Sequence, residues 1–289
     1  MLFTHTPVES YAIGKRDILV KREDQCGPVG APTFSKIRGL IPYLEKLKAD
    51  NPKLEVVGYV ETSISMAGWG VAWACRELGL KCLIFDPQYI PDSELSILRM
   101  HRRQWTKYGA VITPVPAGRA KVNWYVAKKR MDEELGDIGH LLPLGLPFPE
   151  TIYATSNEVY YTIKKQMIPV DAIVVNVGSG TIAAGIVHAL YTHMELNDIK
   201  VYGIMGRSGN IHNKRQSILA HAEIPPEGSL FAPDIPFIRI IDPGWEYTQK
   251  SEIKSPFPSH PYYDLKAWEW LVNNHESIEG SILFWNIGR

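Results

Sequence analysis

The sequence has few of the residues that mark disulfide-rich or metal-binding proteins. Its 289 residues include only three cysteines, Cys26, Cys75 and Cys82, and no C-x-x-C pair. An odd, unpaired set does not indicate a disulfide framework or a zinc site, and we expect Cys75 and Cys82 to be small buried apolar residues. The nine histidines lack metal-binding spacings such as H-E-x-x-H, so we propose no metal site.

The sequence also lacks long apolar runs. No stretch approaches the roughly 18 apolar residues that a membrane helix needs. The N-terminal residues lack a basic segment, an apolar run and a small-residue cleavage site, so we predict no secretory signal. With 45% hydrophobic and 21% charged residues, the composition is that of a globular protein of one or two domains. We expect a cytoplasmic protein with no membrane partner.

Acidic residues are missing from one long window. Lys+Arg and Asp+Glu both total 31, which gives a net charge of zero, yet residues 95–131 contain no acid. The window holds nine basic residues: Arg99, Arg102, Arg103, Lys107, Arg119, Lys121, Lys128, Lys129 and Arg130. It therefore carries +9 and the rest of the chain −9. A neutral chain can still present a strongly positive face.

Short apolar segments alternate with segments of helical periodicity. We predict strands over 18–20, 54–60, 81–85, 110–114, 172–176 and 201–205, and helices over 36–48, 67–78, 93–108, 122–135, 152–166 and 182–194. This alternation predicts an α/β fold with two open, mostly parallel sheets flanked by helices. Ligands are expected at the carboxyl ends of the strands.

Three loops between strands and helices carry possible chemistry. The glycine-rich turn at 176–181 suits a phosphate, although it is also a plausible tight turn. Lys36 lies in the first turn of a predicted helix, where the dipole disfavours a cation. A desolvated lysine there could form a Schiff base with an aldehyde cofactor, whereas the alternative is a solvated surface lysine. The hydroxyls and N–H groups of 61–70 could hold a carboxylate or simply cap a helix.

Together these loops resemble the pyridoxal-phosphate enzymes of the tryptophan synthase β-like group (fold type II), which includes cysteine synthase, threonine dehydratase, aminocyclopropane-carboxylate deaminase and D-cysteine desulfhydrase. Residues 20–38 resemble the motif K-x-E-D…S-F-K-x-R, residues 61–72 E-x-T-S-G-N-T-G-I-G-L-A, and residues 178–185 G-x-G-G-T. Residues 262–267 and 282–288 are similar to Y-x-G-K-A…F-x-x-T-G-G of the deaminase branch. The resemblance spans residues 18–288.

The resemblance implies a site with pyridoxal 5′-phosphate in a cleft between two domains. The larger, cofactor-binding domain would comprise 1–35 and 141–289, the smaller mobile domain 36–140, and the protein would form a homodimer. Lys36 would bear the Schiff base and Tyr263 would assist proton transfer. The other implied site residues are Gly178, Ser179, Gly180 and Thr181 for the phosphate, Asp264 or Asn286 for the pyridine nitrogen, and Ser63, Ile64, Ser65 and Ala67 for the substrate.

Two of these positions depart from the family pattern. Met66 stands where the family has the asparagine that bonds the 3′-oxygen of the cofactor. Thr181 stands where the second glycine of the phosphate turn is expected. These departures motivate one alternative, a non-catalytic relative that acts as a binding protein.

The main hypothesis is a lyase, deaminase or decarboxylase that breaks a bond at or next to Cα of a free amino acid. In the alternative, the same chemistry acts on an amino acid attached to a nucleic-acid base, as in phage DNA hypermodification, for example by decarboxylating an aminoacyl-thymidine. Basic side chains would then bind phosphates, with Trp105, Tyr108, Trp124 and Tyr125 stacking on bases. The candidate contacts are Arg99, Arg102, Arg103, Lys107, Lys121, Arg207, Lys214 and Arg215, the last three in a predicted loop. If the substrate is not attached to a nucleic acid, the basic helices are simply amphipathic helices whose basic faces are exposed to solvent.

Overall fold

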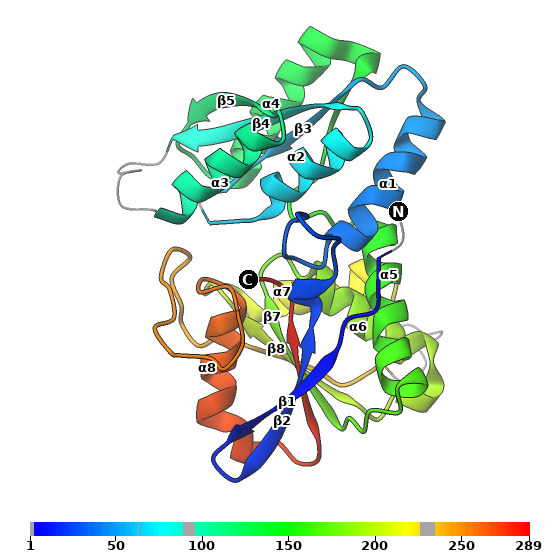
Figure 1. Cartoon of the computed structure of the whole chain (residues 1–289), viewed down its shortest axis with the longest axis vertical. Coiled ribbons are helices and arrows are strands. Elements are labelled where there is room, and N and C mark those ends of the chain that lie inside the picture. Colours follow the sequence, from blue (N-terminus) through cyan, green and yellow to red (C-terminus); the bar gives the residue numbers. More distant parts are fainter. Residues whose placement is uncertain (1–2, 63, 89–95, 226–234) are drawn as a thin grey trace. The chain divides into compact units, whose positions relative to one another are not determined.

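A computed structural model of the chain describes residues 3–62, 64–88, 96–225 and 235–289 (Figure 1). The chain divides into two compact units. The larger unit comprises Met1–Pro28, Thr33–Arg38 and Pro149–Arg289, and the smaller comprises Val29–Pro32 and Gly39–Phe148. The functions expected of the two domains, cofactor binding and movement, remain predictions.

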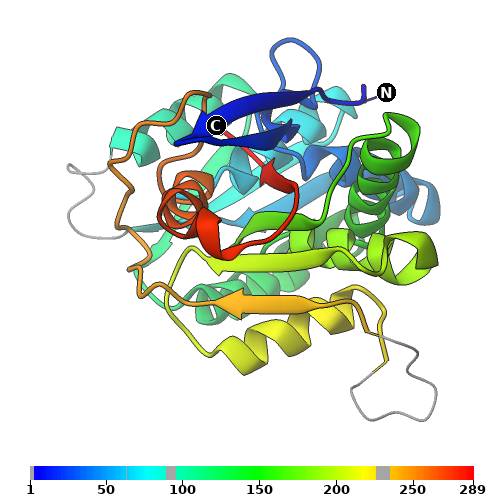
Figure 2. The ribbon, with the colours of Figure 1, turned by 90° about the horizontal axis from the view of Figure 1, so that it is seen from below.

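The larger unit is built on a six-stranded sheet. The strand order is β1 (Val8–Ile13), β2 (Arg16–Arg22), β10 (Ile282–Asn286), β7 (Ala172–Val177), β8 (Lys200–Met205) and β9 (Ile238–Ile241). Only the β1–β2 hairpin is antiparallel. Figure 2 shows the sheet running from β1 in dark blue to β9 in orange. Strands β2, β10, β7, β8 and β9 are parallel, so their carboxyl ends lie at one edge of the sheet, where α/β proteins bind their ligands.

Helices bury both faces of this sheet. They are α5 (Pro149–Tyr160), followed by a π-helical turn (Tyr161–Lys165), α6 (Thr181–Thr192), α7 (Ile211–His221) and α8 (Asp264–Asn274). Alternate residues of β7 join different cores: Ile173 and Val175 pack with α5 and α6, whereas Val174 packs with Trp268 of α8. A strand buried on both faces reads as a continuous apolar run, which is how β7 reads in the sequence.

The smaller unit contains a four-stranded, fully parallel sheet. Its order is β5 (Val111–Pro116), β4 (Lys81–Gln88), β3 (Val56–Val60) and β6 (Gly139–Leu141). Its helices are α1 (Ile37–Asp50), which begins in the larger unit, α2 (Ala67–Glu77), α3 (Ser96–Lys107) and α4 (Ala120–Leu135). Gly58 brings β3 close to α4, because a Cβ there would lie 2.2 Å from Met131 Sδ. Cys75 and Cys82 are buried free thiols, as predicted.

The predicted α/β class with two mostly parallel sheets is confirmed, but several elements were not predicted. Strands β1, β6, β9 and β10 were not expected, and residues 211–215, interpreted as loop, begin α7. The predicted start of a helix at Ser93 lies outside the described residues. Within the part of the chain that the structure describes, no helix has the length and apolar character to cross a membrane.

Candidate active site

Loops that follow four parallel strands meet at the carboxyl edge of the larger sheet. Lys36 comes from the loop between β2 and α1, and its Nζ donates a hydrogen bond of 3.0 Å to Ser179 Oγ, which follows β7. Arg207 follows β8, and Ile287 follows β10. The sheet thus gathers residues that are up to about 250 positions apart in the sequence.

The backbone around Lys36 is fixed on both sides. Ser35 N donates to Ile287 O at 3.0 Å, and Phe34 forms a β-bridge with Gly288. Arg38, in the first turn of α1, is buried and forms two hydrogen bonds of 2.9 Å to the Glu23 carboxylate. A buried bidentate arginine–carboxylate pair holds its elements in one geometry. The lysine therefore projects from a rigid turn.

The turn at residues 178–181 has the features of a phosphate site. Gly180 has φ +96°, and Thr181 begins α6. Ser179 Oγ lies 3.0 Å from Thr181 Oγ1 and accepts a bond of 3.4 Å from Thr181 N. The first N–H groups of a helix have no intrahelical acceptor and attract an anion, and two hydroxyls stand beside them. The turn fits a phosphate group.

The two glycines of this turn should respond differently to alanine. A Cβ on Gly180 would lie 2.9 Å from Ile218 Cγ1 and would occupy a backbone conformation that side chains rarely adopt, whereas a Cβ on Gly178 would lie 3.5 Å from Tyr263. We expect Gly180→Ala to lower the free energy of unfolding by about 1–3 kcal/mol. Gly178→Ala is the matched control and should change it by less than about 0.5 kcal/mol. Urea denaturation of both variants checks this, and equal losses would contradict it.

Two cations stand next to the same turn. Lys214 Nζ, from α7, donates a bond of 2.7 Å to Gly178 O. Burial, and after it the charge of Arg207, lowers the pKa of Lys214. The Arg207 guanidinium lies over the ring of Tyr247, 5.8 Å from its centroid. Positive charge gathered in this way favours the binding of an anion.

Tyr263 reaches the turn from the end of the loop before α8. Its ring lies beside Gly178, and its hydroxyl is 3.0 Å from the Tyr247 hydroxyl. Asn176, at the end of β7, donates a bond of 2.8 Å to Tyr263 O and fixes its backbone. Tyr263 and Lys36 therefore approach adjacent residues of one turn.

Asp264 is a buried carboxylate at the start of α8. Its two oxygens accept bonds from Ile287 N at 3.1 Å and Gly288 N at 3.2 Å. Burial outweighs these bonds and raises its pKa to about 7. The carboxylate fastens the segment after β10 to α8.

This raised pKa predicts a dependence of stability on pH. The folded protein keeps a proton on Asp264 where the unfolded chain has lost it, so the stabilisation is complete below about pH 4 and is lost as the pH rises to about 7. The free energy of unfolding of the cofactor-free wild type, relative to Asp264→Asn, should fall by a few kcal/mol over that range. Urea denaturation at a series of pH values measures it. A constant difference would show that Asp264 does not titrate there.

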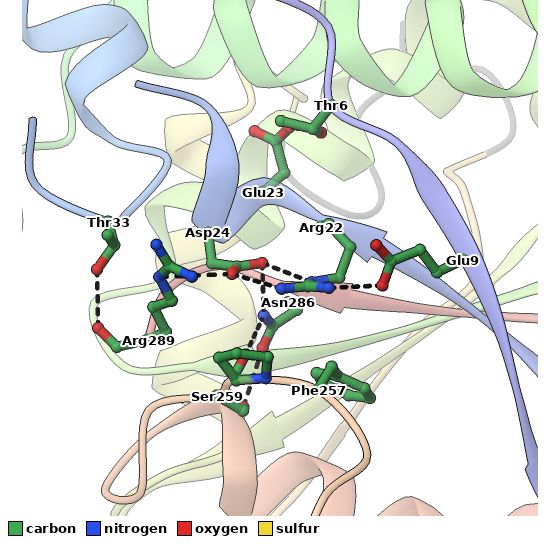
Figure 3. A network of polar contacts seen from close by, with 12 residues as sticks. Thr6, Glu9, Arg22, Glu23, Asp24, Thr33, Phe257, Ser259, Asn286 and Arg289 are labelled. Atoms are coloured by element: carbon green, nitrogen blue, oxygen red, sulfur yellow. Dashed lines mark hydrogen bonds and ion pairs between the residues drawn. The ribbon is translucent and has the colours of Figure 1, made fainter. Parts of the chain in front are cut away.

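Asn286, the other candidate partner of a ring nitrogen, belongs to a polar network around Asp24 (Figure 3). Its amide nitrogen donates to Asp24 Oδ1 at 2.9 Å and to Pro258 O at 3.0 Å, and its oxygen accepts from Ser259 Oγ at 2.9 Å. The Arg22 guanidinium donates two bonds of 2.9 Å to the Asp24 carboxylate. Both polar atoms of the Asn286 side chain therefore make hydrogen bonds within the protein interior.

The candidate substrate loop lies in the smaller unit, between β3 and α2. Ser63 lies outside the described residues, whereas Ile64, Met66 and Ala67 are buried. Ser65 Oγ accepts a bond of 3.1 Å from Ala67 N. The buried Glu61 carboxylate accepts bonds from Thr62 N and Gly68 N, and burial raises its pKa to about 8. Glu61 was not among the predicted site residues. Its carboxylate holds the loop by accepting hydrogen bonds from the loop backbone.

The basic helices of the smaller unit do not offer the predicted row of stacking aromatics. Trp105 and Tyr108 are buried, and Trp124 Nε1 donates to Leu142 O at 2.8 Å, so of the four predicted rings only Tyr125 is exposed. The interpretation of Trp105 and Tyr108 as base-stacking residues was therefore wrong, because Trp105 lies on the inward face of α3 and Tyr108 is buried just after that helix. Arg102 pairs at 2.7 Å with Asp86. The exposed candidate cations here are Arg99, Arg103, Lys107 and Lys121.

Lys266 was also not among the predicted site residues. Its side chain is fully buried, and its Nζ donates to two carbonyl oxygens, Gly206 O at 2.7 Å and Glu246 O at 2.9 Å. Burial lowers the pKa of Lys266 to about 8. The side chain fastens the segment after β8 to the segment that carries Tyr247. A lysine in the first turn of a helix was the signal that selected Lys36, and the same signal is present at Lys266.

Comparisons with known proteins identify the family of this chain. Residues 3–233 match the family described as pyridoxal-phosphate dependent enzyme, and the chain belongs to that family. It is 35% identical, over 292 residues and 100% of both chains, to the glycyl-dTMP PLP-dependent decarboxylase of Pseudomonas phage M6. It is 26% identical over 193 residues to the biosynthetic L-threonine dehydratase of Burkholderia multivorans, which is 66% of this chain and 34% of that enzyme.

Solved structures show the same fold. An ACC deaminase homologue superposes with a TM-score of 0.76 at 21% identity, over 99% of this chain and 89% of that one. A pyridoxal 5′-phosphate-dependent aspartate racemase superposes with a TM-score of 0.66 at 15% identity, over 99% and 90% of the two chains. The predicted family resemblance, enzyme class and cofactor are thereby confirmed. The comparisons favour the nucleotide-borne substrate over the free amino acid of the main hypothesis.

Proposed function

We propose that this enzyme uses pyridoxal phosphate to decarboxylate a glycyl group carried on thymidine in DNA. The observation that carries the proposal is the similarity, over the full length of both chains, to a phage enzyme named glycyl-dTMP PLP-dependent decarboxylase. The cations beside the phosphate turn, Arg207 and Lys214, support a substrate that bears phosphate. We further propose that the enzyme acts in the host cytoplasm.

The reaction breaks the bond between Cα and the carboxyl carbon, releases carbon dioxide and places a proton on Cα. When bound, pyridoxal phosphate supplies an aldehyde that links to amines and a ring that accepts the electron pair of the broken bond. Lys36 would hold the cofactor covalently, and residues 178–181 would hold its phosphate. Their hydroxyls and helix N-terminus fit that group.

The remaining candidate residues would handle protons and orientation. The Lys36 amino group would deliver the proton to Cα, and the Tyr263 hydroxyl would assist this transfer. Asp264 would keep a proton on the ring nitrogen, since an ionised carboxylate stabilises an adjacent cation. The interior contacts of Asn286 favour Asp264 for this role. Ser65 and its neighbours would orient the substrate.

The test offers the holoenzyme two kinds of substrate in parallel, DNA with glycyl-modified thymidine and free amino acids. The proposal predicts conversion of the modified DNA. If the enzyme converts free amino acids but not the modified DNA, the proposal is contradicted and the free amino acid of the main hypothesis is favoured.

A further inference from the structure

The group of side chains formed by Arg207, Lys214 and Tyr247 is not explained by cofactor binding alone. We propose that Arg207 and Lys214 form a second phosphate subsite, which holds the phosphate of the substrate nucleotide next to the phosphate of the cofactor. This inference rests on the proposed function and adds the part of the site that would recognise a nucleotide.

The first observation is the position of the two charges. Lys214 Nζ bonds to Gly178 O, and Lys214 Cδ lies 3.9 Å from the place of a Cβ on Gly180, so the side chain lies along the phosphate turn. Arg207 is near enough for its charge to depress the pKa of Lys214. Two adjacent cations repel each other unless an anion binds between or beside them.

The second observation is the lack of an internal counter-ion. In the described ranges of the chain, neither Arg207 nor Lys214 has a carboxylate within ion-pair distance. Asp242 lies near this loop, but its oxygens accept from Ser208 Oγ, Gly209 N and Gly244 N. The first turn of α7 also contains no acid. An unpaired cation in that turn opposes the helix dipole, so an external anion would relieve both penalties.

The third observation is the rigidity of the loop that bears Arg207. Ser208 N donates to Trp245 O at 2.7 Å, and the buried Lys266 binds Gly206 O on the other side. The guanidinium lies over Tyr247, whose hydroxyl contacts that of Tyr263. The arginine is therefore preorganised for binding, over a tyrosine whose hydroxyl contacts the candidate catalytic Tyr263. Arginine suits phosphate because its N–H groups match two phosphate oxygens.

The experiment measures equilibrium binding of dTMP and of thymidine to the holoenzyme by calorimetry, so it does not depend on turnover. The wild type should bind dTMP at least about tenfold more tightly than thymidine, and Arg207→Leu should lose that advantage. Lys200→Met is the control, because Lys200 begins the strand that Arg207 follows and lies at the opposite edge. Lys214→Met should weaken dTMP binding in the same direction.

The affinity for pyridoxal phosphate separates the alternatives. We expect Arg207→Leu to retain the cofactor affinity of the wild type. If dTMP binds equally well to Arg207→Leu and the wild type, or if the variant loses pyridoxal phosphate instead, the second subsite is refuted. Failure of the proposed function has a different signature, since dTMP selectivity would persist while glycyl-modified DNA stays unconverted.

Discussion

Replacement of Lys36 by alanine should abolish turnover and the visible absorbance of covalently bound pyridoxal phosphate. Lys36 Nζ lies 3.0 Å from Ser179 Oγ, at the turn that fits the cofactor phosphate, and its backbone is fixed by Ser35 and Phe34. The variant loses both the covalent link and the proton-transfer group, so we expect a loss of at least about 10³-fold in kcat. The measurements are the absorption spectrum and steady-state kinetics.

The control for this change is Lys254→Ala, which removes an exposed lysine of the same unit. It should retain the spectrum and the rate of the wild type. Circular dichroism should show that Lys36→Ala is folded, because its side chain is only partly buried. A folded Lys36→Ala enzyme with normal absorbance and turnover would disprove the assignment of Lys36.

Asp264→Asn should lower kcat by about two orders of magnitude while pyridoxal phosphate still binds. The asparagine cannot hold a proton on the ring nitrogen by charge, and the loss of one preorganised electrostatic group commonly has an effect of this size. It also points an amide N–H group at Ile287 N or Gly288 N, which removes one of two backbone hydrogen bonds. A loss of stability of about 1–3 kcal/mol should accompany the loss of rate.

Asp171→Asn separates these two effects. The Asp171 carboxylate also accepts a backbone bond, from Ser281 N at 2.6 Å, but it lies just before β7, at the opposite edge of the sheet. This variant should lose stability without losing the rate of the folded enzyme. Equal kcat values for folded Asp264→Asn and the wild type would assign Asp264 a structural role alone.

Much of the fold could be predicted because apolar strands and periodic helices alternate along the chain. The predicted segments that became β3 and β7 are buried along their whole length, and those that became β4 and β8 are mostly buried, so all four are rich in apolar residues. Helix α7 was missed because Ile211 is followed by six polar residues, 212–217, so the helical periodicity is weak. Its capping signal was present, since Asn210 accepts a bond from Asn213 N.

Candidate site residues could be selected from the sequence where a loop motif fixes the local geometry. They were harder to select where the burial of a side chain determines its role. Lys36 and the 178–181 turn were selected from their loop motifs together with the family resemblance, and the structure brings them into contact. Leu98, His101 and Trp105 are spaced so that they lie on one face of a helix, and that face is buried. This spacing predicts that Trp105 points inward, but the prediction of base stacking did not take it into account. The burial of Lys266 and Glu61 depends on segments far away in the sequence, which local pattern does not reveal.

Mass spectrometry of the DNA product tests the central claim most directly. DNA that carries glycyl-modified thymidine is incubated with the purified enzyme loaded with pyridoxal phosphate, and with Lys36→Ala as the blank. The account predicts that the modified thymidine loses one carbon dioxide and retains its amine in the wild-type reaction alone. Recovery of unaltered modified DNA from a holoenzyme that converts a free amino acid would contradict it.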